Sequence, residues 1–305
     1  MYHVDEIELD YKPRNTIGAL MPNLSNGIMM SDFESSFLCG LLKKFKPSKI
    51  LELGVSHGGS TAVILQCMKE LQQPFSMYSI DTRETVHKNP GLEIGYLGLE
   101  ASELLNIHDY HLYRGVYFPQ VVDEIGRDFD FVILDTTHTI PGEVLEFLAV
   151  LPFLAPNAVV CLHDLRQNHN GPSEIHAVAC AALFNSVVAE KYINTDRRRV
   201  LDYPNIGAFK INDDTRTYRN NVIGTLTQTW TSMLDENILE EYTAIIKRYY
   251  PEDSIWLYTM AVSMNQETYR KSFLDRNTAK VLRKFHRAFR KQKHPKSTRK
   301  QYRLR

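Results

Sequence analysis

One stretch, Ile50–Thr61, restricts the fold of this chain more than any other. A short apolar run leads to the acidic residue Glu52, a glycine-bearing turn follows, and a helical pattern of apolar residues opens at Ser60. This order predicts a strand, a tight loop and a helix N-terminus. Glycine adopts positive φ angles freely and, because it has no Cβ, lets a ligand lie against the backbone. The stretch therefore predicts a nucleotide-binding loop.

The spacing of the loop differs from the dinucleotide fingerprint G-x-G-x-x-G. Ser56 stands where the second glycine would be, and Glu52 would repel a pyrophosphate but not the ammonium group of a methionine. The E-x-G-x-x-x-G spacing of Glu52, Gly54 and Gly58 resembles motif I of class I S-adenosylmethionine-dependent methyltransferases. Another nucleotide and a purely structural turn stay open as alternatives.

Composition restricts the class of protein further. Lys plus Arg and Asp plus Glu both number 36, so no net charge favours a nucleic acid, and 43% hydrophobic residues suffice for a core. The four cysteines form no C-x-x-C pair, which predicts buried free thiols in a reducing compartment. The N-terminus has no apolar signal core, and prolines interrupt the longest apolar stretch. We therefore expect a cytoplasmic protein without a membrane span.

Strand and helix patterns alternate through the middle of the chain. Strands are expected at about 49–53, 76–80, 111–114, 129–134, 158–163, 190–194 and 206–211, and helices at about 60–72, 98–107, 117–126, 141–150 and 173–186. Such alternation predicts βαβ units and a mainly parallel sheet that is covered on both faces. The last two strands suggest an antiparallel hairpin. The resemblance implies a Rossmann-like, doubly wound α/β fold with seven strands.

Four segments are expected along the chain. Residues 1–30 show no sustained period and predict an irregular arm, whereas Ser31 and Glu34 have the spacing of a capping box that opens the methyltransferase domain, 31–212. Residues 213–277 predict a helical extension, with helices at about 221–234, 236–250 and 253–264. The tail, 278–305, is basic, and it predicts either a flexible end or a peripheral contact with an anionic surface.

Two further strand ends predict contacts with a nucleoside. Asp81 ends the second expected strand, followed by Thr82, and a carboxylate there can accept hydrogen bonds from ribose hydroxyls. The alternative for Asp81 is a plain turn residue. Gly115 ends the third expected strand, where the resemblance implies a contact with adenine, and a turn glycine is an equal alternative. Val116 stands where the family often has an acidic residue.

The next two strand ends carry a concentration of titratable groups. Asp135 follows an apolar strand, with His138 on the loop beyond it, and the following strand ends in His163 and Asp164. Parallel strands present their carboxyl ends at one edge, where open α/β sheets bind ligands. Four such side chains at one edge are more than a core needs, which indicates a functional site.

This pattern is similar to the branch of cephalosporin-hydroxylase-like and macrocin-type O-methyltransferases. The resemblance implies that Asp135, His163 and Asp164 hold a divalent metal ion beside the methyl donor, with Asp135 also in the cofactor site. His163 replaces a glutamate of some relatives, so Mn²⁺ competes with Mg²⁺ as the expected ion. As general base, His138 is the first candidate and His163 the second.

The sequence thus favours O-methylation of a small-molecule or glycan hydroxyl with S-adenosylmethionine. Two alternatives stay open: an RNA-directed methyltransferase docked by the basic tail, and a non-catalytic module that binds S-adenosylmethionine. The sequence determines neither the identity of the acceptor nor the oligomeric state, and a homo-oligomer stays open.

Overall fold

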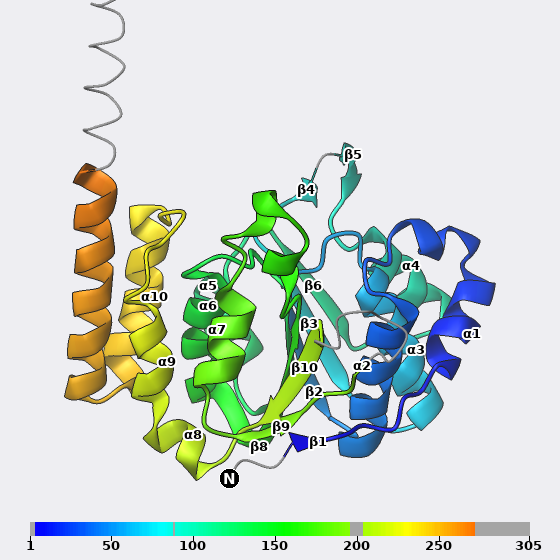
Figure 1. Ribbon diagram of the computed structural model, residues 1–305. Helices are drawn as coiled ribbons and strands as arrows, with labels where there is room; N and C mark the ends of the chain where they lie inside the picture. Colours follow the sequence, from blue (N-terminus) through cyan, green and yellow to red (C-terminus); the bar gives the residue numbers. More distant parts are fainter. Residues whose placement is uncertain (1–3, 88, 196–203, 272–305) are drawn as a thin grey trace, which may run out of the picture.

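The computed structural model describes residues 4–87, 89–195 and 204–271, and its centre is one eight-stranded sheet (Figure 1). The strands, in spatial order, are β1 (Val4–Asp5), β9 (Glu190–Tyr192), β10 (Ile206–Lys210), β8 (Leu154–His163), β7 (Phe129–Leu134), β2 (Lys49–Leu53), β3 (Ser76–Asp81) and β6 (Tyr110–Arg114). Only β10 runs antiparallel to its neighbours. The predicted seven-stranded, mainly parallel sheet is confirmed, and β1 adds an eighth strand at the β9 edge.

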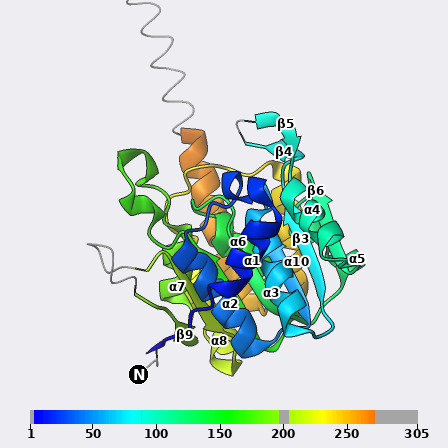
Figure 2. The same ribbon diagram turned by 90° about the vertical axis from the view of Figure 1, so that its right-hand side faces the viewer.

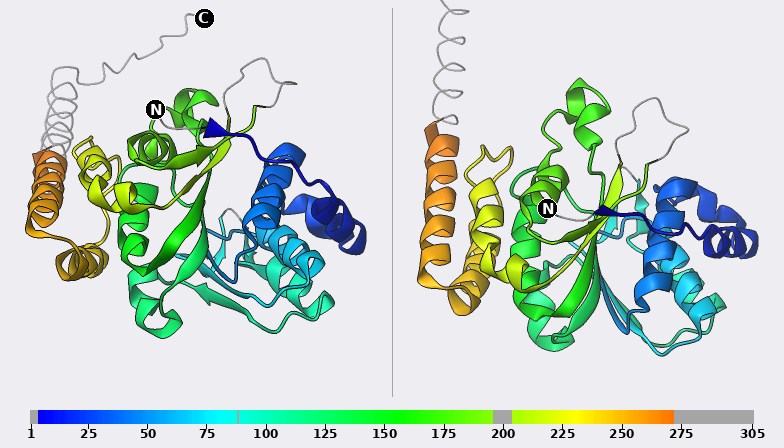
Figure 3. Two further views of the ribbon diagram at one scale, coloured as in Figure 1. Left: turned by 90° about the horizontal axis from the view of Figure 1, so that it is seen from below. Right: turned by 60° about the horizontal axis from the view of Figure 1, so that its bottom comes forward.

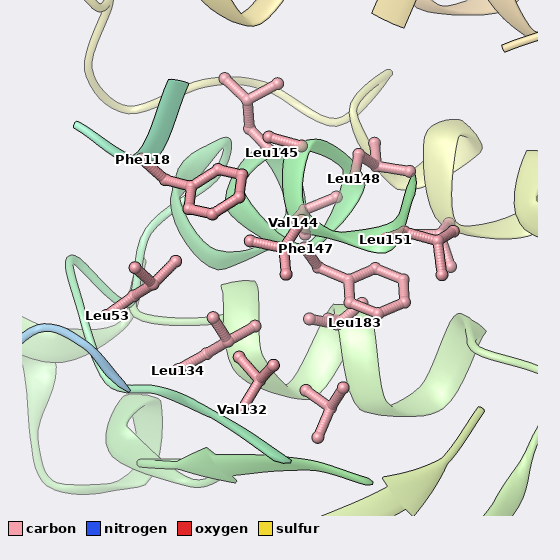
Figure 4. Close-up of a cluster of buried hydrophobic side chains, with 14 of the residues drawn as sticks. Leu53, Phe118, Val132, Leu134, Val144, Leu145, Phe147, Leu148, Leu151 and Leu183 are labelled. Carbon is pink, nitrogen blue, oxygen red and sulfur yellow. The ribbon is translucent and has the colours of Figure 1, made fainter. Parts of the chain in front are cut away.

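Helices cover both faces of the sheet, as the alternation of patterns predicts (Figures 1 and 2). One face carries α2 (Asp32–Phe45), α3 (Gly59–Leu71) and α4 (Tyr96–Leu104), and the other carries α5 (Phe118–Ile125), α6 (Gly142–Val150) and α7 (Ala179–Ser186). Because side chains alternate along a strand, Ile50 packs against the layer of α2, α3 and α4, and Leu51 packs against the layer of α5, α6 and α7. Figure 4 shows the buried cluster around α6.

The arm before α2 is more regular than expected. Residues 12–20 form α1 (Lys12–Leu20), followed by a 3₁₀ turn, η1 (Pro22–Asn26). In α1 only Pro13 and Ile17 are buried. Two buried positions give no helical period in the sequence, so the helix is not predicted. The predicted capping box at the start of α2 is confirmed: Ser31 and Glu34 exchange hydrogen bonds between side chain and backbone.

The predicted helical extension packs outside α5–α7 (Figure 3). It contains α8 (Asp213–Thr217), α9 (Arg219–Thr225), α10 (Glu236–Tyr249) and a helix over 252–271. The helix expected at 221–234 is wrong in extent, because α9 ends at Thr225 and a loop leads to α10. Apolar residues of α9 and α10 join the cluster around α6. The predicted basic tail, 278–305, lies outside the described residues.

Three smaller features complete the fold. A two-stranded hairpin that the sequence patterns do not reveal, β4 (Thr85–Val86) and β5 (Asn89–Glu93), follows β3. Short 3₁₀ turns are η2 (Leu151–Phe153), η3 (Gln167–His169) and η4 (Pro172–Glu174), and the helix expected from 173 starts only at Ala179. The four cysteines are free and buried, as predicted. Within the described ranges, every helix is too short or too polar to cross a bilayer.

Candidate active site

The backbone geometry of the loop after β2 lets this loop pack against the end of β7. Gly54 has φ of +90°, and Ser56 lies in the left-handed region as well, at +51°. A Cβ at position 54 would lie 1.9 Å from the carbonyl oxygen of Asp135, far inside van der Waals contact. Glycine is therefore needed for this loop to meet the end of β7.

Asp81 at the end of β3 binds this loop. Its Oδ2 accepts hydrogen bonds from the backbone N–H groups of Val55 and Ser56, each at 3.0 Å, and its Oδ1 accepts one from the N–H of Arg83. Asp81, Thr82, Gly54 and Ser56 all line one cavity. The structure thus brings these four predicted cofactor residues together.

Glu52 lies beneath the loop and not in the cavity wall. Its side chain is fully buried and accepts hydrogen bonds from the hydroxyls of Ser60, Thr61 and Ser79 at 2.6 to 2.9 Å. Burial raises the pKa of Glu52 to about 7, although the three hydroxyls oppose the shift. Glu52, which is predicted as a cofactor residue, is absent from the cavity wall: this side chain joins β2 to α3 and β3 and holds the loop from below.

Gly58 and Gly115 shape loops without reaching the cavity wall. Gly58 precedes α3 with φ of +86°, and a Cβ there would lie 2.7 Å from the backbone nitrogen of Gly98, so glycine lets α3 and α4 pack closely. A Cβ at Gly115 would lie 2.5 Å from the Glu84 carboxylate. The structure therefore favours a turn role for Gly115 over a direct contact with adenine.

The cavity has a volume of about 460 Å³ and opens at the carboxyl ends of β2, β3, β7 and β8. It joins the glycine-bearing loop to the side chains predicted at β7 and β8. Parts of the chain outside the sheet complete the wall: Met29 from the arm, His87 from the β4–β5 hairpin, and Ser232, Leu234 and Tyr242 from the helical extension. One cavity therefore borders both halves of the predicted site.

The four titratable groups predicted at β7 and β8 meet at one end of this cavity. The Nε2 atom of His138 lies 3.4 Å from Oδ2 of Asp164 and 3.9 Å from Oδ1 of Asp135. The Nδ1 atom of His163 lies 3.3 Å from Oδ2 of Asp135 and 3.5 Å from Oδ2 of Asp164. The two strand ends thus form a single cluster, as their position at one sheet edge predicts.

His163 is the most buried member of this cluster, with 4% of its surface exposed. Its Nε2 atom faces Oε2 of Glu34 at 3.6 Å, so three carboxylates surround the ring. Burial opposes a charge on the ring, but Asp135, Asp164 and Glu34 outweigh it and raise the pKa of His163 well above its ordinary value. The side chain of His163 is thus less accessible than that of His138, which is 20% exposed.

His138 is held by Glu143, a residue of α6. The Oε1 atom of Glu143 accepts hydrogen bonds from the backbone N–H groups of Thr136 and His138 at 3.1 and 2.8 Å, and it lies 3.2 Å from Nδ1 of His138. His138 has φ of +61°, a conformation that costs energy for a residue with a Cβ. Glu143 stabilises this conformation and leaves Nε2 facing Asp135 and Asp164.

The same neighbours set the charge of His138. Burial alone would lower the pKa of His138, but contact with Glu143 and the charges of Asp135 and Asp164 raise it to about 9. The imidazole is therefore protonated at neutral pH as long as all three carboxylates carry their charge.

Sequence patterns do not place three buried glutamates in the site, namely Glu34, Glu143 and Glu146. Glu143 and Glu146 lie three residues apart on α6, and Thr136 Oγ1 donates a hydrogen bond to Glu146 Oε2 at 2.9 Å. Two acids at this spacing inside an apolar helix, directly after the His138 loop, are the signal that could have found them. The capping-box pattern identifies Glu34 only as a helix cap.

The side chains present fit a divalent cation. Asp135, His138 and Asp164 each offer a ligand atom, and these atoms lie within 4.8 Å of one another. The three side chains are 17 to 24% exposed, so an ion could reach them from the cavity. Two carboxylates with one imidazole suit Mn²⁺ better than Mg²⁺, which prefers oxygen ligands alone. The predicted ligand His163 stays a prediction, and His138 is a second imidazole beside the same two carboxylates.

Residues 51–165 match a family model described as a methyltransferase domain. The matched segment contains the β2 loop, Asp81 and the whole Asp135–Asp164 cluster. Over this segment the chain resembles a methyltransferase domain. The predicted resemblance is thereby confirmed at the level of a methyltransferase domain, and the narrower branch stays a prediction.

Several solved structures resemble this methyltransferase domain at low sequence identity. An O-methyltransferase from Bacillus cereus, in complex with SAH, is 15% identical with a TM-score of 0.45, and the match covers 65% of this chain and 90% of that chain. The O-methyltransferase TomG from Streptomyces achromogenes, involved in tomaymycin synthesis and in complex with SAM, is 14% identical with a TM-score of 0.47, and the match covers 68% and 92%. The search of curated proteins found no match.

Proposed function

We propose that this methyltransferase domain transfers a methyl group from S-adenosylmethionine to a hydroxyl group of a small-molecule or glycan acceptor. One observation carries the proposal: a single cavity joins the β2 loop and Asp81 to Asp135, His138 and Asp164. A nucleoside site and a proton-accepting site that share one cavity are what methyl transfer to oxygen requires.

The cofactor half rests on Gly54, Ser56 and Asp81. A carboxylate offers about four lone-pair sites, and backbone N–H groups occupy three of them at Asp81. The remaining site, on a side chain that lines the cavity, can accept a hydrogen bond from a ribose hydroxyl. The backbone of the β2 loop then borders the methionine part of the ligand, where glycine permits a close approach.

The acceptor half rests on His138, Asp135 and Asp164. S-adenosylmethionine supplies a methyl group on a positively charged sulfur, and the acceptor oxygen must lose its proton as the new C–O bond forms. His138 can take that proton through Nε2 once its ring is neutral. A divalent cation held by Asp135 and Asp164 would offset their negative charge and would thereby lower the pKa of His138. The cation would also acidify the acceptor hydroxyl.

Calorimetric titration with S-adenosylhomocysteine tests the cofactor half. We expect one binding site per chain and at least a tenfold loss of affinity in Asp81→Ala, because a charged hydrogen-bond partner of the ribose is removed. Asp123→Ala, at an exposed position on α5, is the matched control and keeps the wild-type affinity. Equal affinity in Asp81→Ala and wild type would contradict the assignment.

Transfer of a labelled methyl group to a panel of phenolic, sugar and aliphatic hydroxyl compounds tests the acceptor half. We expect the label to enter at least one acceptor at oxygen, and His138→Ala to lower turnover by about 10² to 10⁴. Label incorporated at nitrogen or carbon only, or turnover unchanged in His138→Ala, would contradict this half.

A further inference from the structure

One part of the cavity is not used by the roles assigned so far. Asp81 on β3 lies between two groups of wall residues, since β3 is flanked by β2 on one side and by β6 on the other. The acidic cluster lies on the β2, β7 and β8 side. On the β6 side the wall is formed by Val116, Tyr117 and Phe118, which follow β6. If the ribose lies at Asp81 and the methionine at the β2 loop, the base extends towards this second group.

This base end of the cavity is closed by the helical extension. Leu145 of α6 and Leu234 and Tyr242 of the extension line it together with Tyr117. The rings of Tyr117 and Tyr242 meet edge to face, with their centroids 6.2 Å apart. Phe118 and Leu145 belong to the same buried cluster around α6 (Figure 4). A space with aromatic and aliphatic walls suits a flat heterocycle.

Glu146 brings a carboxyl group close to these apolar walls, near enough to Tyr117 and Tyr242 for its negative charge to add to burial in raising the pKa of both phenols. It is 9% exposed and lines the cavity, and the hydrogen bond from Thr136 Oγ1 engages its Oε2 atom. Burial, reinforced by the charge of Glu143, raises the pKa of Glu146 to about 8. Glu146 is therefore mostly protonated at neutral pH, when a carboxylic acid both donates and accepts hydrogen bonds.

Adenine presents the matching groups on one edge: the N6 amino group is a donor and the N1 atom is an acceptor. We propose that Glu146 is the residue of this chain that selects adenine, by accepting a hydrogen bond from N6 and donating one to N1. This inference rests on the proposed function, because it places the base of S-adenosylmethionine at this end of the cavity. It also gives the helical extension a role as the outer wall of the cofactor site.

The test compares two ligands that differ only in the N6 group: S-adenosylhomocysteine and its analogue with unsubstituted purine as the base. Calorimetry with the full chain gives the ratio of their dissociation constants. We expect wild type to prefer the adenine ligand about tenfold, since the analogue leaves an oxygen of Glu146 without its donor. In Glu146→Met, of similar length, the ratio falls to about one. In Glu146→Gln, whose amide also donates and accepts, the ratio stays near the wild-type value.

The outcomes separate this inference from the function beneath it. If wild type binds S-adenosylhomocysteine but binds the purine analogue equally well, the inference fails and the proposed function stands. The same holds if Glu146→Met folds, as judged by its thermal transition, and keeps the wild-type ratio. If Glu146→Met does not fold, the wild-type ratio and its retention in Glu146→Gln decide the question. If wild type binds neither ligand, the proposed function fails together with the inference.

Discussion

Glu52 makes the stability of this fold depend on pH. Its carboxyl group is fully buried beneath the β2 loop, and burial raises its pKa from 4.5 to about 7. In the unfolded chain the group loses its proton near pH 4.5, whereas in the folded chain it keeps the proton to about pH 7. The folded state therefore binds more protons between these values, and the free energy of unfolding falls as the pH rises through this window.

The magnitude follows from the shift. A difference of about 2.5 pKa units at 1.36 kcal/mol per unit amounts to about 3 kcal/mol, of which about 2.5 kcal/mol falls between pH 5 and pH 8. Glu52→Gln removes the titrating group and keeps a side chain of the same shape, whose amide oxygen can accept from two of the hydroxyls of Ser60, Thr61 and Ser79 and whose amide nitrogen can donate to the third. The variant should therefore gain about 2.5 kcal/mol relative to wild type when the pH is raised from 5 to 8.

Urea unfolding at pH 5 and pH 8 measures this effect as a difference between variant and wild type, which cancels the contributions of other titrating groups. Glu100→Gln, at an exposed position on α4, is the matched control, and its difference from wild type should be the same at both pH values. A Glu52→Gln difference that does not change with pH, or that changes in favour of wild type, would refute the reasoning.

Three further predictions concern the cap, the loop and the metal ligands. Ser31→Ala removes the capping box of α2 and should lower the free energy of unfolding by about 1 kcal/mol in urea titrations; an unchanged midpoint would contradict the observed cap. Gly54→Ala places a Cβ 1.9 Å from the Asp135 carbonyl oxygen and should weaken S-adenosylhomocysteine binding more than tenfold, as measured by calorimetry. Wild-type affinity in this variant would show that the loop can move away from Asp135. Asp164→Ala should weaken Mn²⁺ binding at least tenfold in paramagnetic resonance titrations, whereas Mn²⁺ affinity equal in Asp164→Ala and wild type would exclude a metal ion held by Asp135 and Asp164.

Much of the fold follows from local patterns in the sequence. The strands β3, β7 and β8 are largely apolar runs that end in a polar residue or directly before one, and the parallel arrangement of the central strands follows from helices of the right length between them. That Asp81, Asp135 and Asp164 share one edge of the sheet follows from the same rule, because each ends a parallel strand. For such residues the position in the strand fixes the position in space.

The remaining features depend on contacts that no local pattern encodes. Glu143 reaches His138 because α6 packs over the end of β7, and Glu34 of α2 reaches His163 from 129 positions earlier in the chain. The sequence offers both His138 and His163 as candidate bases, and only the structure shows how unequally they are buried, at 20% and 5% exposed. The arm escapes prediction because α1 buries too few side chains to show a period.

A crystal structure of the chain with S-adenosylhomocysteine would show whether one cavity holds the methyl donor between Asp81 and the Asp135–Asp164 cluster. We expect ribose hydroxyls within about 2.6 to 3.2 Å of the Asp81 carboxylate, with the sulfur atom on the side of Asp135 and His138. A ligand with its ribose away from Asp81, or bound outside this cavity, would show that the donor site lies elsewhere.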